Sequence, residues 1–308
     1  MSPRRGRAVA ALLLLSMAHA AIAGESFAQE RTPPVFRAAA DAVAVDVAVQ
    51  RGGRPVADLQ ASDFTILDNG VPQEVSGLTY ERLPVDVTLL LDVSASVSGV
   101  ALEELRRAVR QLRADLRPDD RLRLLTFNMR PYLRVDFGSP AGDLDAALTT
   151  LSAGGSSAVF DSLAVALAAP DAPGRRRLLV LLSDGQDSSS STDPASVIDI
   201  ARRSGSTVAI MLGSAGRDRP ASLLRATTET VGTFADRLAV ETGGMVSAIA
   251  PGESLASRFR RMLQDFRTSY VLYFTPRGVD RAGVHTLDVR VKREGVAVRA
   301  RRTYVAGE

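Results

Sequence analysis

The sequence predicts an α/β fold: a doubly wound, mostly parallel, Rossmann-like sheet flanked by helices, with a small accessory β unit from the N- and C-terminal segments. Two short apolar runs, 87–91 and 178–182, are typical of strands buried on both faces, as in parallel sheets. Segments with the apolar periodicity of helices lie between these two runs and after the second. Strands that alternate with helices in this way favour a parallel sheet covered by helices on both faces. At both ends of the chain the apolar period is two, which predicts antiparallel strands.

The elements follow one another in a regular order. Val43, Val45, Val47 and Val49 alternate with other residues, and a strand around Phe64 and Ile66 precedes the turn signal Asp68-Asn69-Gly70. After the first apolar strand we expect a helix over 102–116, strand 121–127, edge segment 132–137, helices 144–151 and 159–169, strand 178–182, helix 195–203, strand 207–212, a helix ending at 242–244, strand 245–249 and helix 254–266. Alternating strands return at 270–275, 287–291 and 296–299. Because a lone hairpin is marginal in water, we expect the two terminal segments to pack together.

The first residues are typical of a signal peptide. Arg4, Arg5 and Arg7 precede an apolar run over 8–15, and small residues allow cleavage after Ala23 or Ala28. The run is too short to span a bilayer, so we expect an exported protein, periplasmic or extracellular, without stable membrane insertion after cleavage. An uncleaved N-terminal anchor is the alternative. The expected divisions are signal peptide 1–28, N-terminal β segment 29–83, α/β domain 84–268 and C-terminal β segment 269–308.

Composition narrows the class of protein. The chain has no cysteine, so it must be stabilised by core burial alone, and its 308 residues are enough for a sizeable core. Cleavage after Ala23 removes three arginines and no acids, which turns a charge balance of 38 − 35 into 35 − 35. A near-neutral mature chain gives no reason to expect nucleic acid or an anionic membrane as partner.

Oxygen-bearing side chains gather where strands are expected to end. Asp92, Ser94 and Ser96 form a D-x-S-x-S pattern after the first apolar strand, Ser157 follows Gly154-Gly155, and Asp184 follows the second apolar strand. Open parallel sheets bind ligands at the carboxyl ends of their strands. Carboxylate and hydroxyl oxygens suit hard cations such as Mg²⁺ or Ca²⁺. D-x-S-x-S taken alone also fits a loop that caps a helix with serine hydroxyls.

In combination these residues resemble the metal-ion-dependent adhesion site of von Willebrand factor type A domains. The resemblance assigns Asp92, Ser94, Ser96, Ser157 and Asp184 as metal ligands. It implies a divalent cation, Mg²⁺ first and Mn²⁺ or Ca²⁺ as alternatives, with an open position for an acidic side chain of a protein partner. The sequence departs from the family at Ser157, where threonine is usual. Serine keeps the hydroxyl but lacks the β-branch that stiffens the side chain, so a looser site is expected.

The flanking segments resemble a narrower group, the bacterial VWFA-related proteins common in Acidobacteria. The residues that carry this likeness are Gly53-Arg54-Pro55-Val56, the stretch from Asp63 to Gly70, and the terminal strand from Arg299 to Tyr304. The resemblance covers nearly all of the chain after the signal peptide.

Little in the sequence points to catalysis. After the signal peptide the only histidine is His285, far in sequence from Ser94 and Asp184, and we expect it at a surface or sheet edge. No phosphate-binding glycine motif is present. Asp187 and the serines 188–191 are expected to form a flexible polar rim. We therefore expect a non-enzymatic, metal-dependent protein-binding module. The alternatives are a metal-assisted hydrolase that uses the same Asp and Ser cluster, and a structural domain with an empty site.

Overall fold

The computed structural model describes residues 42–170, 172–212, 231–248 and 253–307. The predicted signal peptide and both of its cleavage positions lie outside these ranges. Within them, no helix combines the length and the apolar character needed to cross a membrane.

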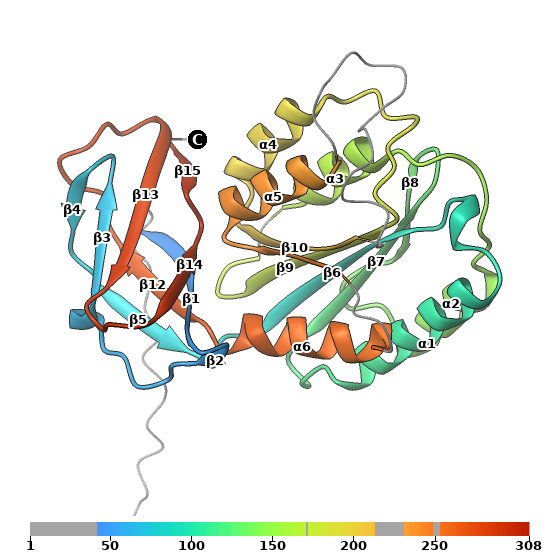
Figure 1. Cartoon of the computed structure of the whole chain (residues 1–308), viewed down its shortest axis with the longest axis horizontal. Coiled ribbons are helices and arrows are strands. Elements are labelled where there is room, and N and C mark those ends of the chain that lie inside the picture. The colour runs from blue at the N-terminus through green and yellow to red at the C-terminus, as the bar shows by residue number, and fades with distance from the viewer. Residues whose placement is uncertain (1–41, 171, 213–230, 249–252, 308) are drawn as a thin grey trace, which may run out of the picture. The chain divides into compact units, whose positions relative to one another are not determined.

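A six-stranded sheet forms the centre of the α/β part (Figure 1). Its order is β11 (Met245–Ala248), β10 (Ser206–Leu212), β9 (Arg176–Ser183), β6 (Val85–Asp92), β7 (Arg121–Phe127) and β8 (Pro131–Val135). The first five strands run parallel, and only β8 is antiparallel to its neighbour β7. All eight residues of β6 are buried, because β6 has a strand on each side and helices on both faces. The predicted doubly wound, mostly parallel sheet is confirmed.

Helices cover both faces of this sheet. On one face lie α1 (Val100–Ala114), α2 (Ala141–Thr150) and α6 (Leu255–Arg267). On the other lie α3 (Val159–Leu167), α4 (Pro194–Arg203) and α5 (Val231–Thr242). Each helix buries one apolar stripe against the sheet; in α1 the stripe contains Leu102, Leu105, Val109 and Leu112. The two helix layers leave the carboxyl ends of the parallel strands as a rim of loops.

The terminal segments form two small antiparallel sheets that share one apolar core. One sheet runs β14 (Ala297–Ala300), β1 (Val43–Arg51), β12 (Tyr270–Phe274) and β5 (Gly77–Tyr80), with β2 (Arg54–Pro55) beside β1; the other runs β15 (Thr303–Ala306), β13 (Gly283–Val291), β3 (Phe64–Asp68) and β4 (Val71–Gln73). A short 3-10 helix, η1 (Ala61–Asp63), precedes β3. The N- and C-terminal segments therefore pair strand to strand, as in Val45 opposite Leu272 and Ile66 opposite Val289.

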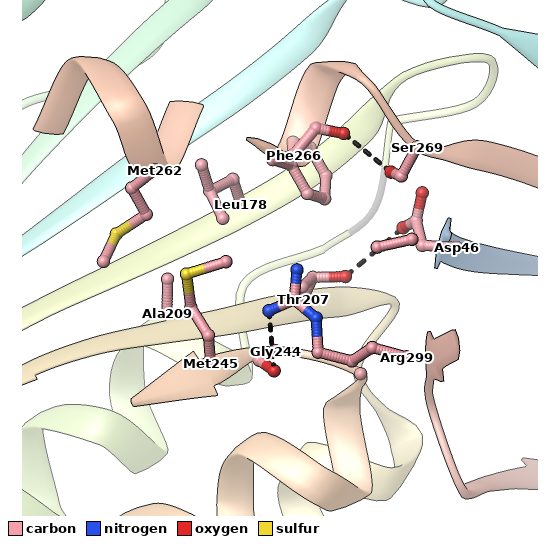
Figure 2. A pocket seen from close by; sticks show the side chains of 12 residues that line it. Asp46, Leu178, Thr207, Ala209, Gly244, Met245, Met262, Phe266, Ser269 and Arg299 are labelled. Atoms are coloured by element: carbon pink, nitrogen blue, oxygen red, sulfur yellow. Dashed lines mark hydrogen bonds between the residues drawn. The ribbon is translucent and has the colours of Figure 1, made fainter. Parts of the chain in front are cut away.

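The terminal β unit contacts the α/β sheet where β9 and β10 begin. Arg176 donates to Asp46 at 2.7 Å, and the Thr207 hydroxyl donates to the same carboxylate at 3.3 Å. Figure 2 shows the Thr207 side of this contact, beside a cavity of about 20 Å³ that has room for one water molecule. Gly244 lies so close to β10 that a Cβ atom would stand 1.7 Å from the Val208 carbonyl oxygen. This contact is at the amino ends of the strands, away from the loops that carry the predicted ligands.

Candidate metal centre

The candidate centre is built on the ends of two adjacent strands. Asp92 is the last residue of β6 and Ser183 the last of β9, and the preceding residues of the two strands are paired in register. The Ser183 hydroxyl donates to Asp92 Oδ2 at 2.9 Å. Only 1% of Asp92 is exposed. Parallel pairing thus places a carboxylate and a hydroxyl side by side at the bottom of the loop rim. Sequence reasoning missed Ser183, although its place at the end of an apolar strand was the signal.

The D-x-S-x-S loop turns back over the Asp92 carboxylate. The Ser94 amide donates to Asp92 Oδ1 at 2.9 Å, which fixes the carboxylate, and the Ser94 and Ser96 hydroxyls lie 3.1 Å apart. The loop continues through the 3-10 turn η2 (Ala95–Val97) to Gly99, whose φ of 65° allows the sharp entry into α1. Ser94 is buried and Ser96 exposed, so the hydroxyls lead from Asp92 toward solvent.

A second loop brings Ser157 to the same carboxylate. Two backbone hydrogen bonds join the loops: Gly154 N to Val93 O at 2.8 Å, and Ala95 N to Gly155 O at 3.1 Å. The Ser157 hydroxyl lies 3.3 Å from Asp92 Oδ1 and 3.2 Å from Oδ2. These long distances leave the carboxylate only weakly bonded on this side.

Asp184 supplies the second carboxylate. It is half-buried directly after β9, and its Oδ1 accepts a hydrogen bond from the Gln186 amide at 3.0 Å. Burial raises the pKa of the Asp92 carboxyl, and the nearby Asp184 charge acts in the same direction, against the hydrogen bonds from Ser94 and Ser183. The structure thus brings the five predicted residues together. Asp92 accepts hydrogen bonds from Ser94 and Ser157, and the Ser96 hydroxyl contacts the Ser94 hydroxyl. The charge of Asp184 acts on Asp92.

The donor set fits a hard divalent cation. Its members are two carboxylates and three hydroxyls, all oxygen ligands of the kind that Mg²⁺ or Ca²⁺ accepts. In the described part of the chain, no group of three or more His, Cys, Asp or Glu side chains is placed to hold a metal ion, so the proposed ligand set depends on hydroxyls as well as carboxylates. Hydroxyl and amide groups donate to Asp92, and no Arg, Lys or His pairs with it among the described residues. A buried carboxylate without a counter-charge is costly, and a bound cation would supply that charge.

Asp187 is not part of the expected polar rim, whereas Ser188 and Ser191 are exposed as that expectation requires. Asp187 is buried and accepts hydrogen bonds from the amides of Val159, at 2.7 Å, and Phe160, at 3.4 Å. Its negative charge therefore caps the first turn of α3. The Ser188 amide donates to the Ser157 carbonyl at 2.8 Å, so this segment also holds the Ser157 loop in place. Sequence spacing gives no sign of these contacts.

His285 is also placed differently from the expectation. It lies on β13 with 1% exposure, so the prediction of a surface or edge position is wrong. Its Nδ1 lies 2.8 Å from Asp68 Oδ1, and the Tyr304 hydroxyl donates to the other Asp68 oxygen at 2.7 Å. Burial, with help from the hydrogen bond to Asp68, raises the pKa of Tyr304. The cluster belongs to the core of the terminal β unit.

Comparison with known proteins identifies the α/β part. The sequence model of the von Willebrand factor type A domain matches residues 86–236. Among solved structures, a von Willebrand factor type A protein from Catenulispora acidiphila is similar over 87% of this chain and 74% of its own, with 14% identity and a TM-score of 0.50. BatB from Bacteroides thetaiotaomicron, a conserved hypothetical protein, covers 59% of this chain and 98% of its own at 14% identity and TM-score 0.45.

A third similar structure is proximal thread matrix protein 1 from the mussel byssus, with a zinc-occupied MIDAS motif. It covers 63% of this chain and 48% of its own, at 14% identity and TM-score 0.46. A comparison with curated proteins found no match.

Proposed function

We propose that this chain binds a protein partner through a divalent cation. Residues 86–236, which would bind the partner, are a von Willebrand factor type A domain, a module of protein interaction. The proposed ligands of the cation are Asp92, Ser94, Ser96, Ser157 and Asp184. The observation that carries the proposal is the state of Asp92. Its carboxylate is buried, receives hydrogen bonds from hydroxyls and an amide, and has no cationic partner among the described residues. Mg²⁺ is the proposed ion, with Mn²⁺ or Ca²⁺ as alternatives.

The ion would supply a positive charge with an open coordination position. The protein supplies three neutral hydroxyls and two carboxylates, so a further negative ligand remains favourable. An acidic side chain of the partner meets that need. Because Ser96 is exposed while Asp92 is buried, solvent and a partner reach the centre from the side of the loops.

We propose that the protein is not an enzyme. His285 belongs to the core of the terminal β unit and pairs there with Asp68, whereas a serine nucleophile needs a histidine within hydrogen-bond reach. Metal-assisted hydrolysis remains testable: turnover of generic ester, phosphate or peptide substrates that needs the metal and disappears in Asp184→Ala would contradict this part of the proposal. Export to the periplasm or cell exterior also belongs to the proposal, since the signal sequence supports it.

Titration calorimetry of the full chain with Mg²⁺, Mn²⁺ and Ca²⁺ tests the metal site. The wild type should bind at least one of these ions, and Asp92→Ala should not. Asp136→Asn is the matched control, because Asp136 is a carboxylate on the same domain that is ion-paired with Arg123, away from the five ligands. If Asp92→Ala binds every ion as the wild type does, the assigned centre is wrong.

The role of the ion in partner binding needs a second experiment. The immobilised full chain should retain more of a protein from the same cell compartment in Mg²⁺ than in EDTA, and Asp92→Ala should retain in either medium only the amount that the wild type retains in EDTA. A partner retained equally in EDTA would contradict binding through the ion.

A further inference from the structure

The edge strand β8 and the residue just before it carry two arginines that pair with no carboxylate among the described residues. Arg130, just before β8, and Arg134, within it, are both exposed. On the neighbouring strand β7, by contrast, Arg123 pairs with Asp136 at 2.7 Å. Positive charge is therefore balanced on β7 and unbalanced on β8.

Tyr132 holds the two guanidinium groups in place. Their central carbons lie 5.3 Å (Arg130) and 5.1 Å (Arg134) from the centre of its ring. Arg130 Nε donates to the Tyr132 hydroxyl at 2.9 Å, and Arg134 Nε donates to Thr126 Oγ1 at 2.8 Å. In both residues the terminal nitrogens have no partner in the described part of the chain. These nitrogens can grip a carboxylate, and fixed side chains lose little entropy when they do so.

The turn that precedes β8 contacts the Ser157 loop. Asn128 donates to the Gly154 carbonyl at 3.0 Å. Met129, which is 63% exposed, lies beside Gly155, where a Cβ would stand 3.5 Å from Met129 Cγ. An exposed apolar side chain thus lies beside the Ser157 loop and directly precedes Arg130 in the chain.

We propose that Met129, Arg130, Tyr132 and Arg134, here called the β8 arginine surface, bind a second acidic side chain of the partner whose first carboxylate completes the metal centre. This inference rests on the proposed function. An acidic protein segment fits because the surface joins two unbalanced cations to the exposed apolar side chain of Met129. Arginine and tyrosine are enriched among residues that dominate binding energy at protein interfaces. Met129 and the Tyr132 ring offer contact area to a polypeptide that a simple anion would not use.

Fluorescence anisotropy of the full chain with a fluorescein-labelled oligo-glutamate peptide tests the surface. We compare the wild type, Asp92→Ala, and the double variant R130Q/R134Q, each in Mg²⁺ and in EDTA. The matched control is R110Q/R290Q, which removes the same charge from two exposed arginines that pair with Asp145 and Asp288. The wild type should keep part of its affinity in EDTA, and that part should fall as salt rises from about 0.05 to about 0.5 M.

R130Q/R134Q should lose about tenfold in affinity in either medium, equivalent to about 1.4 kcal/mol, while the control changes less than about twofold. Asp92→Ala should lose only the Mg²⁺-dependent part. An equal loss in the control, or unchanged binding by R130Q/R134Q in EDTA, overturns the inference. Displacement of the probe by inorganic phosphate as effectively as by unlabelled peptide also overturns it, since the surface would then bind any anion. If Mg²⁺ has no effect while the arginine effect stands, the metal proposal fails and the β8 arginine surface is retained.

Discussion

The two ends of β6 carry buried aspartates with opposite electrostatic surroundings. Asp86, at the start, is 3% exposed and accepts hydrogen bonds from Arg121 at 2.8 Å and Arg175 at 2.6 Å. Burial works to raise the pKa of Asp86, but these two ion pairs outweigh it and hold the pKa below its ordinary value. Asp92, at the end, is equally buried with no cationic partner among the described residues, and burial raises its pKa. A buried carboxylate that is ion-paired with arginines of the same chain stabilises the fold, whereas a buried carboxylate without such partners is suited to bind a metal cation.

The largest expected loss of stability follows substitution of Asp86, the ion-paired aspartate at the start of β6. Asp86→Asn leaves Arg121 and Arg175 without their shared carboxylate, and breaking such a buried pair costs about 3–5 kcal/mol. Because about a third of the Arg121 side chain is exposed, we expect the lower end, about 3 kcal/mol. Urea unfolding measures the loss. The variant should still gain stability from Mg²⁺. A variant as stable as the wild type would show that the two ends of β6 do not differ in this way.

The next largest effect concerns Asp92, the aspartate at the end of β6 without a cationic partner among the described residues, and it is the stability gained from a bound metal ion. An ion that binds only the folded state adds about 2.7 kcal/mol at a hundredfold excess over its Kd. Thermal unfolding in Mg²⁺ and in EDTA should show this increment for the wild type and for Asp86→Asn, but not for Asp92→Ala. An identical response of wild type and Asp92→Ala to every divalent ion would remove the basis of the comparison.

The comparison also predicts opposite pH dependences in EDTA. Asp92 has a raised pKa in the folded state, so its contribution to stability is present below the unfolded pKa of about 3.8 and is lost as pH rises through the folded pKa. Asp86 has a lowered pKa, so its contribution is present above about 3.8 and is lost as pH falls through the folded pKa.

Urea midpoints measured at several pH values from about 3 to about 7, on both sides of the ordinary Asp pKa, separate the two sites. Relative to the wild type, metal-free Asp92→Asn should gain stability as pH rises, and Asp86→Asn should lose it. Parallel curves for the two variants would contradict the assigned environments.

The sequence predicts the candidate metal ligand Asp92 at the end of β6 but not the ion pairs of Asp86 at its start. Asp92 stands out because it follows an apolar run and begins D-x-S-x-S, a local pattern. The pairing of Asp86 depends on Arg175, 89 residues away, and on the strand order β9-β6-β7. His285 was misplaced for the same reason, since its partner Asp68 lies 217 residues away on β3. Apolar periodicity predicts the helices and strands, whereas polar partners are set by register and topology.

The smallest expected effect concerns a single hydroxyl at the metal end. Ser157 lies 3.2 Å or more from both Asp92 oxygens, so Ser157→Ala removes a weak hydrogen bond and one proposed ligand but little packing. We expect Mg²⁺ affinity to fall about tenfold, within the range for groups that support a metal site, with metal-free stability nearly unchanged. Ser157→Thr keeps the hydroxyl and restricts χ1, so it should bind Mg²⁺ as tightly as the wild type or more tightly. Calorimetry of both variants with Mg²⁺ tests this prediction. If Ser157→Ala and Ser157→Thr weaken Mg²⁺ binding equally, the hydroxyl of Ser157 is not a ligand. The metal centre would then depend on Asp92 and Asp184 without Ser157.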